Sequence, residues 1–191
     1  LDRVDAGTAW DIQRAFHETI LTVCSGQHLD LMANTPDLAT CWQIAETKSG
    51  AAFALACYAG GRLATSRSEI LDTFKRFGRD LGTIIQINDD LEDVAGICMH
   101  EFPRRINKTL IGAYMQFANG LATNIGERQL AVCEQSWSSQ ELVRSGSILY
   151  LQLEKLKYAT MAENALSRLK LADDYCRDLI SVVHQESRIG M

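Results

Sequence analysis

Apolar side chains recur every three or four residues along most of this chain, which is the spacing of amphipathic helices. The first such segment runs from Ala9 to about Ala33 and holds the polar Gln27 within its apolar stripe. We expect this stripe to form the buried face of a helix. Its apolar members are Ile12, Phe16, Ile20, Val23 and Leu31.

Start signals divide the next part of the chain into two further helices. Thr35-Pro36 predicts a helix start, with threonine as the cap and proline at the first helical position. The helix that follows is rich in small residues from Ala45 to Ala64, which permits close helix contacts. The capping-box pattern at Ser66-Arg67-Ser68-Glu69 predicts a long helix from Ile70 to about Val94.

In the second half of the chain, the sequence pattern predicts a loop and three more helices. Ser138 and Glu141 form another capping box before the middle helix of the three. The apolar stripe of that helix consists of Leu142, Leu149, Leu153 and Leu156. In order, these elements are a loop over 96–107 and helices over Lys108–Val132, Leu142–Leu169 and Ala172–His184.

No segment alternates apolar and polar residues with the β-branched enrichment of a strand, and no internal repeat or linker interrupts the helices. The sequence therefore predicts an all-α protein with a single helical domain over residues 1–191. The 191 residues are 47% hydrophobic, which is enough to bury a substantial core and argues against a disordered chain. A formal charge of −5 would repel nucleic acid, so an anionic substrate would need local cations or a metal ion.

Six scattered cysteines without a C-x-x-C pair lie mostly among apolar residues, so we expect reduced, buried thiols. The longest apolar stretch, Ala51–Gly61, is too short to span a bilayer, and no signal sequence opens the chain. We therefore expect a cytoplasmic protein without stable membrane insertion. The cysteines are Cys24, Cys41, Cys57, Cys98, Cys133 and Cys176.

One face of the helix predicted over Ile70–Val94 combines two carboxylates and an amide with two glycines. At about 100° per residue, the five positions fall within an arc of about 80°. We expect the glycines to leave open space beside the polar groups. The five residues are Gly78, Gly82, Gln86, Asp89 and Asp93.

The acids of this helix are crowded, since Asp89-Asp90-Leu91-Glu92-Asp93 holds four acids in five positions. Carboxylates three or four residues apart repel one another unless a cation or water lies between them. The helix dipole also disfavours negative charge near a C-terminal end. A solvated acidic helix end is the alternative, but the segment directly follows the apolar Leu81–Ile87 without an intervening cation. We favour a hard divalent cation with oxygen ligands.

The segment Gly82–Asp93 resembles the second aspartate-rich motif of the trans-isoprenyl (polyprenyl) diphosphate synthases, with its glycine and glutamine in register. Three more motifs resemble that family and occur in the right order. Gly26-Gln27-His28-Leu29-Asp30-Leu31 is similar to G-Q-x-x-D-L, Lys48-Ser49-Gly50 to K-T-G, and Lys108-Thr109-Leu110 to the lysine-threonine-leucine that opens the next helix.

The resemblance implies an antiparallel helical bundle of the isoprenoid synthase (class I terpenoid synthase) type. It also implies a prenyltransferase that ionises an allylic diphosphate with Mg²⁺ and condenses it head-to-tail with isopentenyl diphosphate, releasing pyrophosphate. The expected partners are these two diphosphates and a second copy of the chain in a homodimer. The family's first D-D-x-x-D motif is not found in the sequence, so we expect the N-terminal helices to be missing.

The resemblance also implies roles for single residues. Asp89 would ligate Mg²⁺, and Asp90 and Asp93 would complete the coordination shell. Lys48 and Lys108 would bind the diphosphate as charge develops on it.

Near the reacting carbon, the Ser49 hydroxyl, the Gln86 side chain and a carbonyl freed by a helix break at Gly50 would present oxygen dipoles to the allylic cation. We interpret Gln27 and Asp30 as structural.

Departures from the family leave the substrate and the chain length of the product open. Ile85 replaces the usual aromatic residue before the glutamine, Ser49 replaces threonine, and the loop over 96–107 is shorter than usual. One alternative is a prenyltransferase of the same fold that acts on a peptide or another acceptor. Another is a non-catalytic regulatory subunit of a heteromeric synthase.

Overall fold

The computed structural model describes residues 4–33, 36–96, 106, 108–123, 139–169 and 173–188. These residues form helices and short connections without a β-strand, which confirms the all-α prediction. Seven of the elements are α1 (Ala6–Met32), α2 (Leu38–Ala45), the π-helix η1 (Glu46–Gly50), α3 (Ala51–Ala64), α4 (Ser68–Gly96), α6 (Leu110–Thr123) and α7 (Ser139–Arg144). The C-terminal pair is α8 (Ser147–Ser167) and α9 (Asp173–Ser187).

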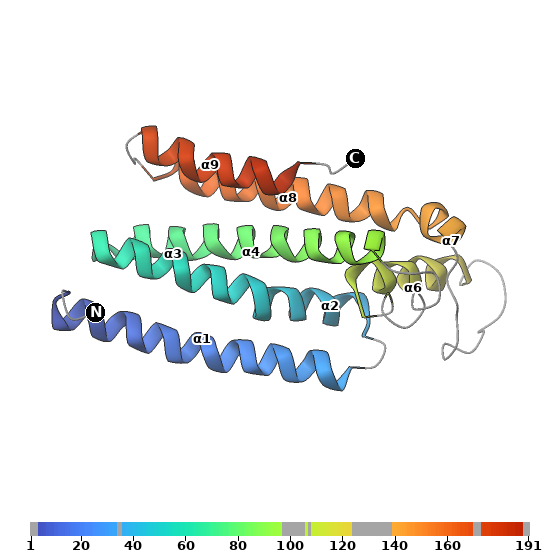
Figure 1. Ribbon diagram of the computed structural model, residues 1–191, viewed down its shortest axis with the longest axis horizontal. Helices are drawn as coiled ribbons and strands as arrows, with labels where there is room; N and C mark the ends of the chain where they lie inside the picture. Colours follow the sequence, from blue (N-terminus) through green and yellow to red (C-terminus); the bar gives the residue numbers. More distant parts are fainter. Residues whose placement is uncertain are drawn as a thin grey trace.

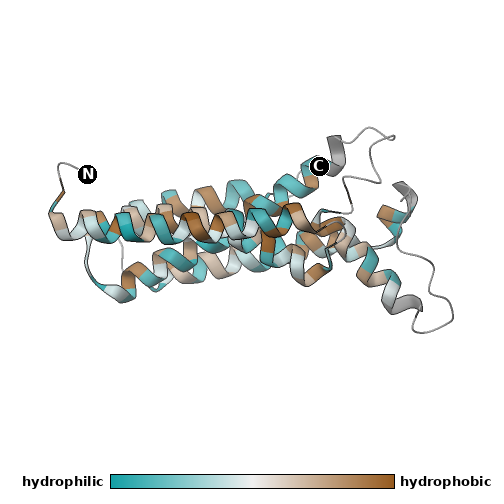
Figure 2. Ribbon diagram, turned by 90° about the horizontal axis from the view of Figure 1, so that it is seen from below, coloured by the Kyte–Doolittle hydropathy of each residue, from teal (hydrophilic) through white to brown (hydrophobic). Residues whose placement is uncertain are grey.

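The long helices form an antiparallel bundle of three layers, as the resemblance implies (Figure 1). α1 is one outer layer, α3 and α4 form the middle layer, and α8 with α9 forms the other outer layer. The shorter α2, α6 and α7 gather at the end of the bundle where α4 finishes. Apolar and polar residues follow one another along the same helices, as expected for amphipathic helices in a bundle (Figure 2).

An apolar stripe of α4 lies at the centre of the core. Ile84 and Ile87 are fully buried, and Phe77 and Leu81 are nearly so. On one side this stripe packs against small residues of α8, Ala159 and Ala162, which let the two helices approach closely. α4 is therefore the fixed element against which the other helices are placed.

The glycines of α4 are contact points, which corrects the prediction that they leave open space. A Cβ atom at Gly78 would lie 2.3 Å from the carbonyl oxygen of Phe53 in α3. A Cβ atom at Gly82 would lie 2.6 Å from the carbonyl oxygen of Ser49 in η1. The backbones of α3 and η1 thus lie directly on α4, where only glycine allows such an approach.

α1 contacts the bundle through small residues, so the predicted burial of its apolar stripe is wrong for the described chain. Thr8 and Gly26 are its buried residues, and a Cβ atom at Gly26 would lie 2.3 Å from Thr47 Oγ1. The close approach at Gly26 sets the rotation of the helix and leaves apolar side chains uncovered. Three members of the predicted stripe, Phe16, Ile20 and Leu31, are 48%, 43% and 68% exposed.

The start of α2 also differs from the prediction. Its N-cap is Asp37, whose carboxylate accepts a hydrogen bond from the backbone N–H of Thr40 at 2.7 Å. Aspartate satisfies a free N–H of the first turn in this way, so Pro36 lies before the cap and outside the helix. The predicted cap, Thr35, lies outside the described residues.

The single helix predicted toward Leu169 is divided into α7 and α8. Gly146, between them, has a left-handed backbone conformation with φ of 70°, which glycine adopts without strain. The predicted leucine stripe of α8 is wrong, because Leu149, Leu153 and Leu156 are exposed. The opposite face is buried, and it carries Leu151, Lys155, Ala159, Ala162 and Leu166.

An aromatic cluster fastens the short helices to α8. The indole N–H of Trp42 in α2 donates a hydrogen bond to the hydroxyl of Tyr150 in α8 at 3.0 Å. The Tyr150 ring also stacks on Tyr114 of α6, with ring centroids 4.1 Å apart. These contacts hold α2 and α6 together at the end of the bundle where α4 finishes.

Four cysteines fall within the described residues, and all four are free thiols. Cys41 is buried and Cys24 is exposed, so the prediction of buried thiols is wrong at Cys24. None of the helices that the structure describes is long and apolar enough to cross a membrane. The loop over 97–105, the helix beyond Thr123, the Ser138 cap, Cys98 and Cys133 lie outside the described residues.

The contact at Gly78 can be tested with Gly78→Ala. We expect the free energy of unfolding to fall by about 1–3 kcal/mol, because a new methyl group meets a backbone that cannot move aside. The matched control is Gly60→Ala in α3, where a Cβ atom meets nothing within 4 Å and helix propensity should add about 0.5–1 kcal/mol. Urea unfolding followed by circular dichroism measures both, and equal stability of the two variants would contradict the close contact.

Asp80 of α4 gives a second test, since its side chain is only 7% exposed and burial raises its pKa to about 6. The folded protein then keeps this proton to a higher pH than the unfolded chain, so stability falls as the pH rises from about 4 to 6. Asp80→Asn should raise the free energy of unfolding at pH 7 by about 1–3 kcal/mol, and this gain should be largely lost at pH 4. Unfolding curves across pH 4–7 measure the difference, and a gain that does not change with pH would count against a buried, protonatable carboxyl.

Candidate active site

A cavity of about 360 Å³ lies where the C-terminal end of α1, α2 with η1, the second half of α4 and the start of α6 meet. Its polar groups include two lysines and three aspartates, and two of the aspartates lie on α4. Its apolar wall comes mainly from α2. The lining residues are Asp30, Cys41, Ile44, Ala45, Lys48, Gln86, Asp90, Asp93, Lys108, Thr109 and Leu110.

The π-helix η1 brings Lys48 to this cavity, whereas the predicted Ser49 is not one of the lining residues. The N–H of Ala51 bonds to the carbonyl of Glu46, five residues earlier, so one extra residue is inserted into the helix. The helix break expected at Gly50 is thus a π-helical segment through which the chain continues as helix. Ser49 Oγ donates a hydrogen bond to Gln86 Oε1 at 2.8 Å, which ties η1 to α4.

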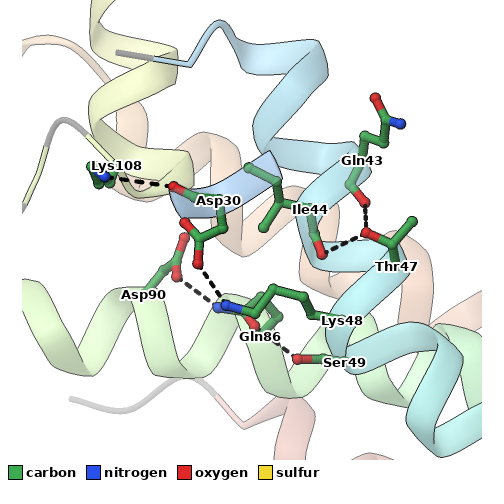
Figure 3. A network of polar contacts seen from close by, with 9 residues as sticks. All are labelled: Asp30, Gln43, Ile44, Thr47, Lys48, Ser49, Gln86, Asp90 and Lys108. Carbon is green, nitrogen blue, oxygen red and sulfur yellow. Dashed lines mark hydrogen bonds and ion pairs between the residues drawn. The ribbon is translucent and has the colours of Figure 1, made fainter. Parts of the chain in front are cut away.

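Both predicted lysines reach the C-terminal end of α1 (Figure 3). Lys48 Nζ lies 2.6 Å from Asp30 Oδ2, and Lys108 Nζ donates to the backbone carbonyl of Asp30 at 3.5 Å. The carbonyls at a helix C-terminus carry partial negative charge, which attracts cations. Two lysines that are 60 positions apart in the sequence therefore converge on one cavity.

The polar groups that α4 turns to the cavity differ from the predicted face at one position, with Asp90 in place of Asp89. Gln86, Asp90 and Asp93 line the cavity, at spacings of four and three residues. Asp89 is exposed and is not one of the lining residues. The backbone contact of η1 at Gly82 fixes this rotation of α4, and a pattern of polar positions alone could not locate that contact.

Asp90 joins α4 to the start of α6. Its carboxylate accepts hydrogen bonds from the backbone N–H of Leu110 at 2.7 Å and from Gln86 Nε2 at 3.0 Å. Burial raises the pKa of Asp90 to about 6, against the lowering effect of these two hydrogen bonds. The carboxylate stabilises the first turn of α6 and thereby holds Lys108, two residues earlier, beside the cavity.

Negative charge is concentrated around Asp89. Desolvation and the nearby carboxylates of Glu92, Asp93 and Glu186 all raise the pKa of Asp89. A cation bound at this end of α4 would relieve the repulsion between these acids.

The donor types at this end of α4 fit Mg²⁺ shared with a phosphate group. Within the described residues, no three His, Cys, Asp or Glu side chains gather closely enough to hold a metal ion by themselves. Mg²⁺ does not require such a cage, because it keeps several waters and is bound by one or two carboxylates together with substrate phosphates. Asp93 lines the cavity and supplies a carboxylate of this kind, with Asp89 four residues earlier on the same helix.

Two further acids lie near the site. The structural interpretation of Asp30 agrees with its contact, because its carboxylate pairs with Lys48 and so joins α1 to η1; Asp30 also lines the cavity. Glu186 carried no signal, because only the packing of α9 beside α4 brings it near Asp89.

Solved structures share this fold. Geranylgeranyl pyrophosphate synthetase from Pyrococcus horikoshii Ot3 matches with a TM-score of 0.78 and 19% identity, covering 98% of this chain and 61% of that protein. The geranylgeranyl pyrophosphate synthetase from Geoglobus acetivorans matches with a TM-score of 0.78 and 16% identity. This match covers 98% of this chain and 60% of that protein. A third match is a geranylgeranyl pyrophosphate synthase from Corynebacterium glutamicum, complexed with isoprenyl diphosphate and magnesium. Its TM-score is 0.74 at 17% identity, and the match covers 97% of this chain and 57% of that protein.

The chain thus spans about three fifths of the length of these structures. At these identities the likeness establishes the shared fold. A comparison with curated proteins gives no match. The family model described as polyprenyl synthetase, however, matches residues 3–111, more than half of the chain and all four motifs of the site. This chain belongs to the polyprenyl synthetase family.

Proposed function

We propose that this chain carries the allylic diphosphate half-site of a prenyltransferase that makes longer prenyl diphosphates with isopentenyl diphosphate as acceptor. The observation that carries the proposal is the convergence of Lys48 and Lys108 with Gln86 and Asp93 on one cavity. Cations, carboxylates and an amide from three elements are the set needed to hold a diphosphate through lysines and a metal ion. A solvated acidic helix end would not require the two lysines.

In the proposed reaction the bond between C1 of the allylic group and the diphosphate oxygen breaks, and its electron pair leaves with pyrophosphate. The double bond of isopentenyl diphosphate then forms the new carbon–carbon bond, and a proton is lost from the adduct. Lys48 and Lys108 bind the oxygens that gain charge as the bond breaks, which lowers the barrier. Their present partner, Asp30, lies at the C-terminal end of α1, so the incoming diphosphate would displace or share these contacts.

Mg²⁺ would neutralise part of the diphosphate charge when bound. Asp93 is the carboxylate that the geometry favours for holding it, and Asp89, which is exposed, is free to join after side-chain rotation. Asp90 contributes mainly by fixing α6, since two of its acceptor positions are used by Leu110 N–H and Gln86. The magnesium complex of the Corynebacterium glutamicum relative supports Mg²⁺ as the cation.

A chain of hydrogen bonds orients the oxygen dipoles that would face the allylic cation. Ser49 donates its hydroxyl hydrogen to Gln86 Oε1, and Gln86 Nε2 donates to Asp90. The lone pairs of Ser49 Oγ are left free to accept, because its only hydrogen is used in the bond to Gln86, which lines the cavity. This arrangement supports Ser49 and Gln86 as the groups next to the developing positive charge.

The homodimer and the single-domain organisation stay predictions. The direct test of function is incubation of the protein with Mg²⁺, an allylic diphosphate and radiolabelled isopentenyl diphosphate. A longer labelled prenyl diphosphate supports the proposal. Diphosphate binding without product, while a partner synthase gains activity, would instead support the regulatory subunit. Consumption of the allylic diphosphate with a peptide acceptor alone would support the other prenyltransferase.

Lys48→Gln tests the diphosphate contact. We expect kcat/KM for the allylic diphosphate to fall by about 10²–10³-fold, because one cation that stabilises the leaving group is lost. Lys157→Gln is the control, since Lys157 is exposed on α8 and pairs only locally with Glu154. Steady-state pyrophosphate release measures both variants, and a similar small effect of the two would place Lys48 outside the reaction.

Asp93→Asn tests the metal contact. The concentration of Mg²⁺ for half-maximal activity should rise by about tenfold or more, because a neutral amide replaces a carboxylate ligand. Asp72→Asn is the control on the same helix, because Asp72 is exposed and lies outside the cavity. Magnesium titrations of pyrophosphate release make the comparison. An unchanged magnesium requirement in the Asp93 variant would exclude this residue as a ligand.

A further inference from the structure

Lys155 is a buried charge that the proposed reaction does not use. It lies on the face of α8 that packs against α4, and it is only 2% exposed. Its Nζ donates hydrogen bonds to Asn88 Oδ1 at 3.1 Å and to the backbone carbonyl of Arg188 at 2.8 Å. Burying an ammonium group costs free energy unless hydrogen-bond acceptors surround it. The burial of Lys155 therefore points to a role for its hydrogen bonds.

Asn88 extends the contact from α8 to the end of α9. Its Nδ2 donates to the backbone carbonyl of Glu186 at 2.9 Å and to Glu186 Oε2 at 3.1 Å. One amide therefore connects a lysine of α8 with a glutamate of α9. The surroundings are apolar, since Ile84 and Val183 nearby in the core are fully buried.

The network lies directly behind the acidic end of α4. Asn88 is the residue before Asp89, and its amide holds Glu186 Oε2 at 3.1 Å, next to the start of the acidic segment. A cation near the last carbonyls of α9 is also favoured by the dipole of that helix. Lys155 thus fixes the end of α9 and the start of the acidic segment with the same ammonium group.

We propose that Lys155 is a positioning residue. Through Asn88, it holds Glu186 and the C-terminal end of α9 against α4, so that Glu186 adds its negative charge beside the proposed cation site. The part that concerns Mg²⁺ rests on the proposed function, whereas the connection between the three helices stands on the hydrogen bonds alone. Loss of the ammonium leaves the Asn88 and Arg188 oxygens without their donor. The start of the acidic segment in α4 and the C-terminal end of α9 should then unfold locally more often.

Hydrogen exchange tests the connection without reference to catalysis. In Lys155→Met, which has a similar length and no charge, amide exchange should rise about tenfold or more over both 88–93 and 183–188. Exchange over 70–80 at the other end of α4 should stay at the wild-type rate. The control is Lys157→Met on the same helix, which should leave all three segments unchanged. Unchanged exchange in either segment of Lys155→Met, or an equal rise along all of α4, would overturn the proposal.

Glu186→Gln provides a second test that does not depend on the folding of the lysine variant. It keeps the size of the side chain and removes the charge near Asp89. The Mg²⁺ concentration that gives half of the magnesium-dependent rise in melting temperature should increase about three- to tenfold. An unchanged concentration would overturn the role given to Glu186. If the wild-type protein itself shows no such rise, the proposed magnesium site is wrong, and the exchange experiment still decides the connection between the helices.

Discussion

The backbones of α3 and η1 lie directly against two glycines of α4, and the candidate site depends on this contact. A side chain at Gly82 would meet the Ser49 carbonyl, so the π-helix can rest on α4 only because no Cβ is present. The same contact sets the rotation of α4 about its axis. That rotation decides which of its acids line the cavity and which face solvent.

The charges of the site are held by groups that also build the fold. Asp90 stabilises the first turn of α6, and Asp30 at the end of α1 holds Lys48. Removing either acid would therefore change both the electrostatics of the cavity and the placement of a helix. This double use explains how cations from η1 and from the start of α6 come to one place.

The four motif segments predicted most of the residues that were proposed for this site from the sequence. Lys48, Gln86, Asp93 and Lys108 were predicted to act together, and the structure brings them to one cavity because their helices cross there. The prediction was less accurate for Asp89, which does not line the cavity, whereas Asp90 does. This difference arises from the rotation of α4 about its axis. Helical periodicity gives relative angles along one helix and not the direction of the neighbouring helix.

The sequence by itself determined that the chain forms helices and where most of them begin and end, because periodicity and caps are local properties. It also determined which residue types are available for chemistry. Only the tertiary structure decided which face of α1 and of α8 is buried, since small residues such as Gly26 and Ala159 select the contact where backbones approach most closely. It likewise decided that Lys155 and Glu186 lie behind the acidic segment, because residues so far apart in the sequence meet only through packing.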